Sequence, residues 1–218
     1  MISSSEENYL KAILSINLKT KGKASTNAIA KEIGTSPASV SDMLRKLQDK
    51  QLIKYKKYKG VELSKSGRKT AITIIRKHRL WETFLVKKLN FNWDEVHDIA
   101  EQLEHIKSVE LINKLDSYLK YPEFDPHGDP IPSQEGQIPT TNTIALNELN
   151  AKNKGTVMGV KTDEKSFLHY LTRLNINIGC EIEIIEKIDF DKSLSIKVKE
   201  KHIHISTDVA KQILIKKT

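Results

Sequence analysis

The 218-residue sequence predicts an α+β protein with an N-terminal winged helix-turn-helix, an all-α middle domain and a small C-terminal β-barrel. Apolar residues recur at helical spacing through most of the first half, whereas apolar and polar residues alternate in the last third. Five of the six prolines lie between these regions, from Pro122 to Pro139, and such a density of proline cannot continue a helix. The expected domains are residues 1–70, 71–136 and 144–218.

The composition is typical of a soluble protein of the cytoplasm. The longest apolar runs are only a few residues, too short to span a bilayer, so no membrane partner is expected. The first residues, MISSSEEN, lack the basic flank and apolar core of a secretory signal. Cys180 is the only cysteine, which excludes disulfides within one chain and thiolate-rich metal sites, and which suits a reducing compartment.

The positive charge is concentrated in the first domain. Residues 1–70 contain 15 Lys and Arg against 6 Asp and Glu, whereas residues 71–218 contain 21 against 22. A basic surface on one domain indicates a polyanionic partner, most simply nucleic acid. A lysine coat that only keeps the domain soluble is the alternative.

Two helices are predicted before residue 35. A pair of serines followed by Glu6 and Glu7 resembles a capped helix start, and Gly22 ends that segment. Thr26 is the expected N-cap of the second helix, which stops at Gly34. The sequence TSP then opens a third helix.

The third helix has a buried and an exposed face. Val40, Leu44 and Leu47 form the buried stripe at helical spacing. Together with the helix before it and the tight turn between them, it forms a helix-turn-helix. The outward residues are Ala38, Ser39, Asp42, Arg45 and Lys46.

A lysine-rich hairpin completes the first domain. The stretch LIKYKKYKGVEL alternates and contains Gly60 between two strand-like arms, which predicts a winged helix-turn-helix. In this fold the recognition helix enters the major groove and the wing lies along phosphates. Lysines on a hairpin can also serve only to prevent aggregation, but next to a capped recognition helix they favour DNA binding.

The start of the recognition helix is expected to read bases, and the basic residues to contact phosphates. Ser36 has capping as an alternative role. Asp42 either accepts a hydrogen bond from a cytosine amino group or lowers nonspecific binding. The base-reading candidates are Ser36, Pro37, Ala38, Ser39 and Asp42, and the phosphate candidates are Arg45, Lys54, Lys56, Lys57 and Lys59.

The middle domain carries a stripe of potential metal ligands. A long helix from Lys65 to about Leu89 places His78 and Glu82 on one face. In the next predicted helix, VHDIAEQLEHIKS, two histidines and two glutamates fall within one arc of about 100°, apart from the apolar residues. These four residues are His97, Glu101, Glu104 and His105. We favour metal binding; a solvated face of carboxylate–imidazole pairs is the alternative.

The C-terminal region alternates in the segments GTVMGV, CEIEIIEKI, LSIKVKE and KHIHIS. A short capped helix, TDEKSFLHYLTRL, interrupts the strands. This arrangement predicts a small β-barrel appended to the helical domains.

In sequence order, EENYLKAI, SPASVSDMLRKL, YKKYKGVELSKSG, RKHRLWETFL, VHDIAEQLEHIKS and DPHGDPIP resemble signatures of a known family. It comprises the iron- and manganese-dependent repressors typified by the diphtheria toxin repressor and the manganese transport regulators. The resemblance spans most of residues 6–132. The C-terminal domain resembles the SH3-like, FeoA-type domain of many members, and the middle domain their dimerisation domain.

The resemblance implies a cytoplasmic transcriptional repressor of metal homeostasis rather than an enzyme. Such a protein binds palindromic double-stranded operator DNA as a homodimer when Mn²⁺ or Fe²⁺ is bound, and it controls metal uptake genes. It has no small-molecule substrate and no catalytic residue.

The resemblance also implies two metal sites. Glu101 stands where iron-type members have a cysteine and manganese-type members a glutamate, so Mn²⁺ is the expected ion and Fe²⁺ the alternative. Lys11 replaces a glutamate of some manganese regulators, which argues against a closely spaced binuclear centre. The implied primary ligands are Asn8, Glu101, Glu104 and His105, and the implied ancillary ligands are His78, Glu82, His97 and Glu164.

Two other classes of protein could carry such a cluster of carboxylates and histidines. A carboxylate-bridged di-iron enzyme needs Glu-x-x-His pairs and a zincin needs His-Glu-x-x-His, and the sequence contains neither. A metal-independent winged-helix regulator with structural histidines is the other. It predicts that Glu104→Ala and His105→Ala leave operator affinity unchanged.

Overall fold

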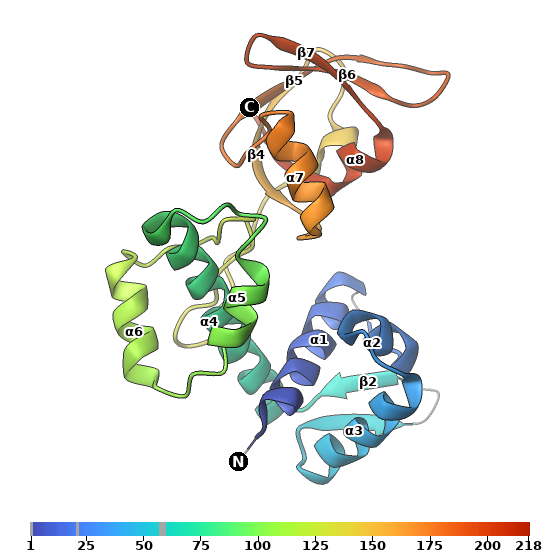
Figure 1. The fold of residues 1–218 in the computed structure, drawn as a ribbon. Coiled ribbons are helices and arrows are strands. Elements are labelled where there is room, and N and C mark those ends of the chain that lie inside the picture. The colour runs from blue at the N-terminus through green and yellow to red at the C-terminus, as the bar shows by residue number, and fades with distance from the viewer. Residues whose placement is uncertain (1, 21, 57–59) are drawn as a thin grey trace. The chain divides into compact units, whose positions relative to one another are not determined.

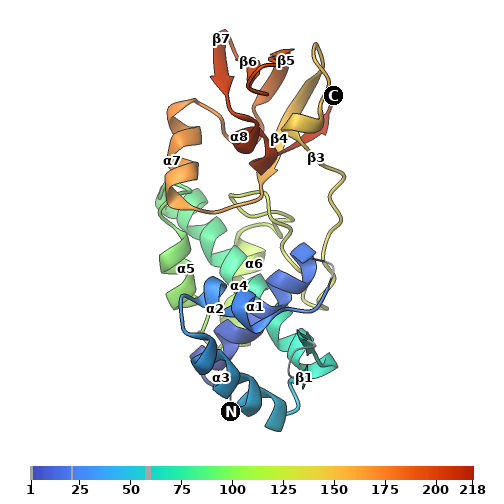
Figure 2. The ribbon, with the colours of Figure 1, turned by 90° about the vertical axis from the view of Figure 1, so that its right-hand side faces the viewer.

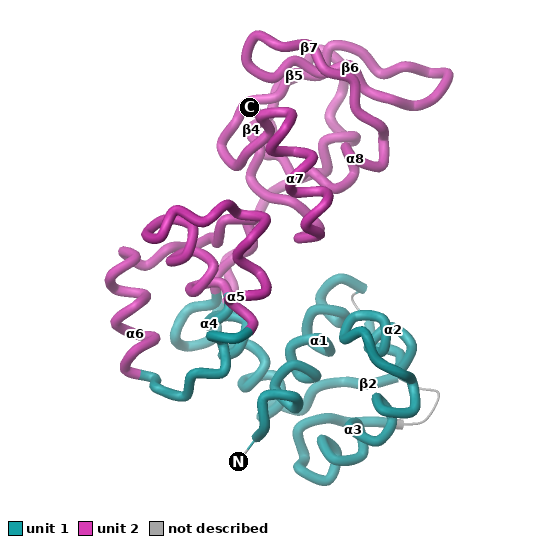
Figure 3. Tube along the Cα trace, in the orientation of Figure 1, with its two compact units in different colours: residues 1–78, 102–109, 132–137 teal, residues 79–101, 110–131, 138–218 magenta. Residues whose placement is uncertain are grey.

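The computed structural model describes residues 2–20, 22–56 and 60–218. The chain forms two compact units (Figure 3). Unit 1 comprises residues 1–78, 102–109 and 132–137, and unit 2 comprises residues 79–101, 110–131 and 138–218. Among the described residues, no helix combines the length and the apolar character needed to cross a membrane.

Helices and strands follow one another along the chain as Figure 1 labels them. The α-helices are α1 (Ser4–Thr20), α2 (Thr26–Ile33), α3 (Pro37–Asp49), α4 (Lys65–Leu89), α5 (His97–Leu103), α6 (Val109–Tyr118), α7 (Lys165–Arg173) and α8 (Thr207–Gln212), and η1 (Leu146–Glu148) is a 3₁₀ helix. The strands are β1 (Ile53–Lys56), β2 (Gly60–Leu63), β3 (Ile144–Ala145), β4 (Lys154–Val160), β5 (Glu181–Lys187), β6 (Leu194–Val198), β7 (Lys201–Ile205) and β8 (Ile213–Lys217).

The helix-turn-helix of unit 1 is built from strong capping signals. Ser25 Oγ accepts a hydrogen bond from the Ala28 N–H, so Ser25 and not the expected Thr26 is the N-cap of α2. Gly34 closes α2 with a left-handed φ of 71°. Ser36 caps α3 as expected, since its Oγ accepts from the Ser39 N–H.

The predicted buried stripe of α3 is confirmed, because Val40, Leu44 and Leu47 are each 0% exposed in the core of unit 1. The wing is an antiparallel pair of β1 and β2, with Ile53 opposite Leu63, and Ala24 forms a further bridge to Val61. Of the wing lysines, Lys57 and Lys59 lie outside the described residues.

The helix predicted to carry all four ligands is shorter than expected. α5 ends at Leu103, and Glu104 and His105 lie in a turn. The prediction of one helical stripe was therefore wrong for these two residues. The Glu104 backbone carbonyl accepts a hydrogen bond from the Lys77 ammonium at 3.0 Å, so it is satisfied outside the helix.

Unit 2 has two buried apolar clusters. Leu80 of α4 packs with Ile112 and Leu115 of α6 in the first. The second cluster is formed by the apolar side chains of an antiparallel sheet and its neighbouring helices α7 and α8 (Figure 2). The strand order of this sheet is β3-β8-β4-β5-β6-β7. The predicted strands are confirmed, but β3 and β7 remain edges, so this SH3-like sheet is not a closed barrel.

Gly67→Ala should destabilise unit 1. A β-carbon at Gly67, in the first turn of α4, would lie 1.9 Å from the Leu52 carbonyl oxygen, so either the helix or the preceding loop must shift. We expect a loss of about 1–3 kcal/mol in the free energy of unfolding, measured by urea denaturation. Gly22→Ala is the control, because a β-carbon there would lie 3.7 Å from the Thr20 carbonyl oxygen, an ordinary van der Waals contact. Equal stability of both variants would contradict this packing.

Candidate metal centre

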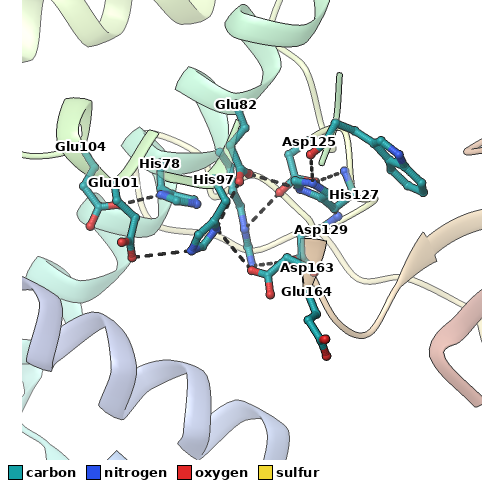
Figure 4. Close-up of polar contacts among 12 residues, drawn as sticks. His78, Glu82, His97, Glu101, Glu104, Asp125, His127, Asp129, Asp163 and Glu164 are labelled. Carbon is teal, nitrogen blue, oxygen red and sulfur yellow. Dashed lines mark hydrogen bonds and ion pairs between the residues drawn. The ribbon is translucent and has the colours of Figure 1, made fainter. Parts of the chain in front are cut away.

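A fully buried carboxylate lies at the centre of the polar cluster in unit 1. Glu104 is 0% exposed, and its Oε2 lies 2.6 Å from His78 Nδ1 (Figure 4). The Lys11 ammonium lies 2.8 Å from Oε1 and 2.9 Å from Oε2 of the same carboxylate. A buried charge is tolerated only with such partners.

The partners keep Glu104 ionised. Burial acts to raise its pKa, but the hydrogen bond with His78 and the positive charge of Lys11 outweigh burial, and the pKa of Glu104 is lowered. The side chain is therefore an anion at neutral pH, ready to bind a cation.

Glu7 orients the neighbouring imidazole. Its Oε2 lies 2.6 Å from His105 Nδ1, and since an ionised carboxylate can only accept, Nδ1 carries the hydrogen. In the neutral form of this imidazole Nε2 has the lone pair, and it lies 3.9 Å from Glu104 Oε1. An imidazole that donates one N–H to a carboxylate while offering its other nitrogen is the usual state of a metal-ligating histidine.

Asn8 lies on α1 between Glu7, which contacts His105, and Lys11, which contacts Glu104. Its Oδ1 is buried, and among the described residues it has no hydrogen-bond partner. A buried carbonyl oxygen without a partner is costly unless a cation or water completes it. Asn8, Glu104 and His105 are candidate oxygen and nitrogen donors without thiolate, a chemistry that suits Mn²⁺ or Fe²⁺.

A second cluster lies in unit 2, around His97 (Figure 4). His97 Nδ1 lies 3.6 Å from Glu82 Oε1 and 3.4 Å from Asp163 Oδ2, and its Nε2 lies 3.7 Å from Glu101 Oε1. These separations exceed a normal hydrogen bond. Ligands about 2.1 Å from one octahedral cation lie about 3 Å apart, so the separation of His97 from Glu82 and that of His97 from Asp163 are each compatible with a shared divalent ion.

Asp163, the neighbour of the expected ligand Glu164, was not identified from the sequence as a residue near His97. Glu164 is exposed and accepts a hydrogen bond from Ser166 at the start of α7, whereas Asp163 reaches His97. Both are acidic residues of one loop, and only the turn into α7 distinguishes them. The sequence therefore predicts that the loop before α7 supplies an acidic residue, but it does not distinguish Asp163 from Glu164.

Behind Glu82 lies a buried network that the sequence did not reveal as part of a site. His127 Nδ1 lies 3.5 Å from Glu82 Oε2, and His127 Nε2 donates to the Trp93 carbonyl at 2.8 Å. Burial lowers the pKa of His127, but its hydrogen bond with Glu82 and the negative charges of Glu82 and Asp125 raise it overall to about 9. Burial, Glu82 and Asp129 raise the pKa of Asp125 to about 7.

The turn that carries His127 is fastened to β4. Gly128 has a φ of +84°, and a β-carbon there would lie 2.0 Å from the Met158 carbonyl oxygen. The Val160 N–H donates to the His127 carbonyl at 3.0 Å. The backbone of one sheet strand therefore fixes the position of the imidazole that faces Glu82.

Two of the implied ligands also have a contact outside their own set. His78, of the implied ancillary set, is hydrogen-bonded to Glu104, and Glu101, of the implied primary set, lies 3.7 Å from His97. Glu7 was not identified as the partner of His105, although it precedes Asn8. The assignments of Asn8, Glu101, Glu104, His105, His78, Glu82, His97 and Glu164 as ligands stay predictions.

Seven of the DNA-reading candidates are exposed on α3, its N-cap and β1. Ser36, Pro37, Ala38, Ser39, Asp42, Arg45 and Lys54 are exposed. Arg45 forms an ion pair with Asp42 at 3.2 Å, in which both side chains remain largely accessible. Lys56 is the last residue of β1.

Three family models match the chain: "Iron dependent repressor, N-terminal DNA binding domain" at residues 1–61, "Iron dependent repressor, metal binding and dimerisation domain" at 64–133, and "FeoA domain" at 144–217. The regulator MntR of Oceanobacillus iheyensis is 31% identical over 121 residues, which cover 56% of this chain and 81% of that protein. The chain belongs to the iron-dependent repressor family. Its members are transcriptional repressors that depend on metal, with both iron- and manganese-dependent types, and they are not enzymes.

Other relatives of the iron-dependent repressor family match over different lengths. The repressor IdeR of Mycobacterium tuberculosis is 32% identical over 153 residues, 66% of each chain. A "Probable metal transport system membrane protein" of Chlamydia trachomatis is 43% identical over 72 residues, 33% of this chain and 16% of its own. The chain thus spans less than two thirds of these two relatives.

The fold agrees with the same family. A solved "Manganese-dependent transcriptional repressor complex with manganese" superposes with a TM-score of 0.87 at 32% identity, covering 98% of this chain and 100% of that one. The superposition therefore covers nearly the whole of this chain.

The metal-free protein should lose stability as the pH rises from about 6.5 to about 9. The pKa of folded His127 is raised to about 9, so its pairing contributes fully below the unfolded value of 6.5 and is lost above the folded value. The raised pKa of Asp125 acts in the same direction at lower pH, between 3.8 and about 7. We expect a loss on the order of 1–3 kcal/mol, measured by urea denaturation at each pH.

His127→Gln should flatten this pH dependence. His204→Gln is the matched control, because His204 is exposed on β7. An unchanged slope in His127→Gln would show that the pairing with Glu82 does not drive the effect.

Proposed function

We propose that this chain is a metal-dependent transcriptional repressor that binds operator DNA as a homodimer when Mn²⁺ is bound. One observation carries the proposal. The first helix of the DNA-binding fold, α1, bears Glu7, Asn8 and Lys11, and two of these meet His105 and Glu104 directly. The ligand cluster of unit 1 and the recognition helix therefore share one compact unit.

The proposed primary ligands in unit 1 are Asn8, Glu104 and His105, with Glu7 as the residue that orients His105. A second set in unit 2 is Glu82, His97 and Asp163, with Glu101 beside His97. Both sets lack thiolate and combine carboxylate or amide oxygen with imidazole, which supports Mn²⁺ with Fe²⁺ as the alternative.

A bound divalent cation would neutralise the carboxylates and add a bond between α1 and the turn after α5. α1 packs on α2 and β2 in the core of unit 1, so a fixed α1 also limits the motion of the helix-turn-helix. If the helix-turn-helix fixed in this way matches a palindromic operator, bound metal raises the affinity of the protein for DNA, and bound DNA raises its affinity for metal by the same factor, typically about 5- to 150-fold.

Dimerisation is proposed through residues 64–133, the region matched by the family's dimerisation model. Within unit 2 this region exposes large apolar side chains, with Leu89 53% and Tyr118 60% exposed. Apolar surface of this kind is typical of a protein–protein contact. A two-fold dimer would present two recognition helices to two half-sites.

Glu104→Gln and His105→Ala should each abolish the metal response of DNA binding. Duplexes selected from a random pool with Mn²⁺-loaded protein would serve as probes, and fluorescence anisotropy would measure affinity in Mn²⁺ and in chelator. We expect the wild type to bind at least about 10-fold more tightly with Mn²⁺, and each variant to show no difference.

His202→Ala is the control for these variants, because His202 is an exposed histidine of β7. Equal wild-type affinity in Mn²⁺ and in chelator would overturn the proposal and favour a metal-independent regulator. Repeating the measurement with Fe²⁺ would distinguish the two candidate ions.

Lys54→Gln should weaken binding to every duplex to a similar extent. Lys54 is exposed on β1 of the wing, where we propose that it contacts a phosphate. Loss of one phosphate contact lowers the slope of log affinity against log salt by about 1. Lys114→Gln removes the same charge from α6, where Lys114 pairs with Glu110, and should leave the slope unchanged.

A further inference from the structure

We propose that Lys11 is an internal competitor for the metal: its ammonium group occupies the Glu104 carboxylate in the metal-free protein and must be displaced when a divalent cation binds there. Lys11 would thereby set the metal concentration at which the protein responds. The inference rests on the proposed function, since it concerns the same unit 1 cluster.

The Lys11 ammonium contacts the Glu104 carboxylate at the position where a metal ion would bind. Lys11 Nζ lies within 2.9 Å of both oxygens of Glu104, at 2.8 Å from Oε1 and 2.9 Å from Oε2. Oε2 also has His78 Nδ1 at 2.6 Å. The Lys11 side chain is only 17% exposed and Glu104 is 0% exposed, so water screens this pair weakly.

A metal ion and the ammonium cannot share this carboxylate at low cost. An ammonium group has three donors and no lone pair, so it cannot act as a ligand while it stays protonated. A divalent ion bound to Glu104 would lie within a few ångströms of Nζ, in a weakly screened site where like charges repel strongly. Metal binding therefore requires the ammonium to leave.

The side chain can leave without moving the backbone. Lys11 is in the middle of α1, whose neighbours Leu10 and Ile13 are fully buried in the core of unit 1. Its four-carbon stem is flexible, and its partly exposed position gives the ammonium a short route to water. The helix stays in place while the charge moves.

A purely structural ion pair is the competing interpretation, and it predicts a change of opposite sign. If Lys11 served only to hold α1 against the turn after α5, its removal would loosen Asn8 and His105 and weaken metal binding. If Lys11 competes with the metal, its removal strengthens binding, because Glu104 is left without its main competitor.

The test measures the Mn²⁺ dissociation constant of the full chain by electron paramagnetic resonance of free Mn²⁺. We expect Lys11→Met to bind Mn²⁺ at least about 10-fold more tightly than the wild type, and Lys11→Arg, which keeps the charge, to stay within about threefold. Lys77→Met is the matched control. Lys77 donates to the Glu104 backbone carbonyl at 3.0 Å, so it lies in the same neighbourhood but not on the carboxylate.

Stability provides a second readout. Lys11→Met leaves a buried carboxylate without its ammonium, so the metal-free variant should melt at a lower temperature and Mn²⁺ should raise its melting temperature more than that of the wild type. Rescue of a poorly folded Lys11→Met by Mn²⁺ supports displacement. A variant that stays unfolded even with Mn²⁺ overturns it, because Lys11 would then be needed in the loaded state.

The outcomes separate this inference from the proposed function. A wild type that binds no Mn²⁺ ends both. A wild type that binds Mn²⁺ while Lys11→Met binds equally or more weakly overturns the displacement alone. A similar gain in Lys11→Met and Lys77→Met also overturns it, because that result reflects only the loss of a nearby positive charge.

Discussion

The burial of the Glu104 carboxylate is the constraint on which the unit 1 cluster depends. With 0% exposure, this anion needs positive partners, and the chain provides Lys11 from α1 and His78 from α4. Those two contacts join helices that are far apart in sequence. Glu104 makes these contacts from the turn that follows the end of α5 at Leu103.

Unit 2 meets a similar requirement in a different way. Glu82 is 2% exposed, and it has imidazoles on both sides, from His97 and from His127. Two buried glutamates of one protein are thus compensated by different sets of groups: Glu104 by an ammonium and an imidazole, and Glu82 by two imidazoles.

Much of the fold was predictable because its signals are local. The cap at Ser36, the buried stripe of α3 and the bounds of α4 follow from residues that lie within a few positions of one another. The site was less predictable. The turn at Glu104 depends on Lys11, 93 positions earlier, and the choice of Asp163 over Glu164 depends on how one loop enters α7. Neither can be derived from helical periodicity. The contact of His127 with Glu82 is also not local, because β4 of the sheet holds the turn that carries His127.

The close packing of Gly128 against the backbone of β4 has a consequence for the synthesis of the protein. His127 faces Glu82 only when its turn rests on the backbone of Met158 and Val160, which lie about thirty residues further along the chain. On the ribosome, the helices that carry Glu82 and His97 emerge well before that strand. The second cluster therefore reaches its final geometry only after the C-terminal sheet has been synthesised, so a nascent chain could acquire its DNA-reading fold before this cluster matures.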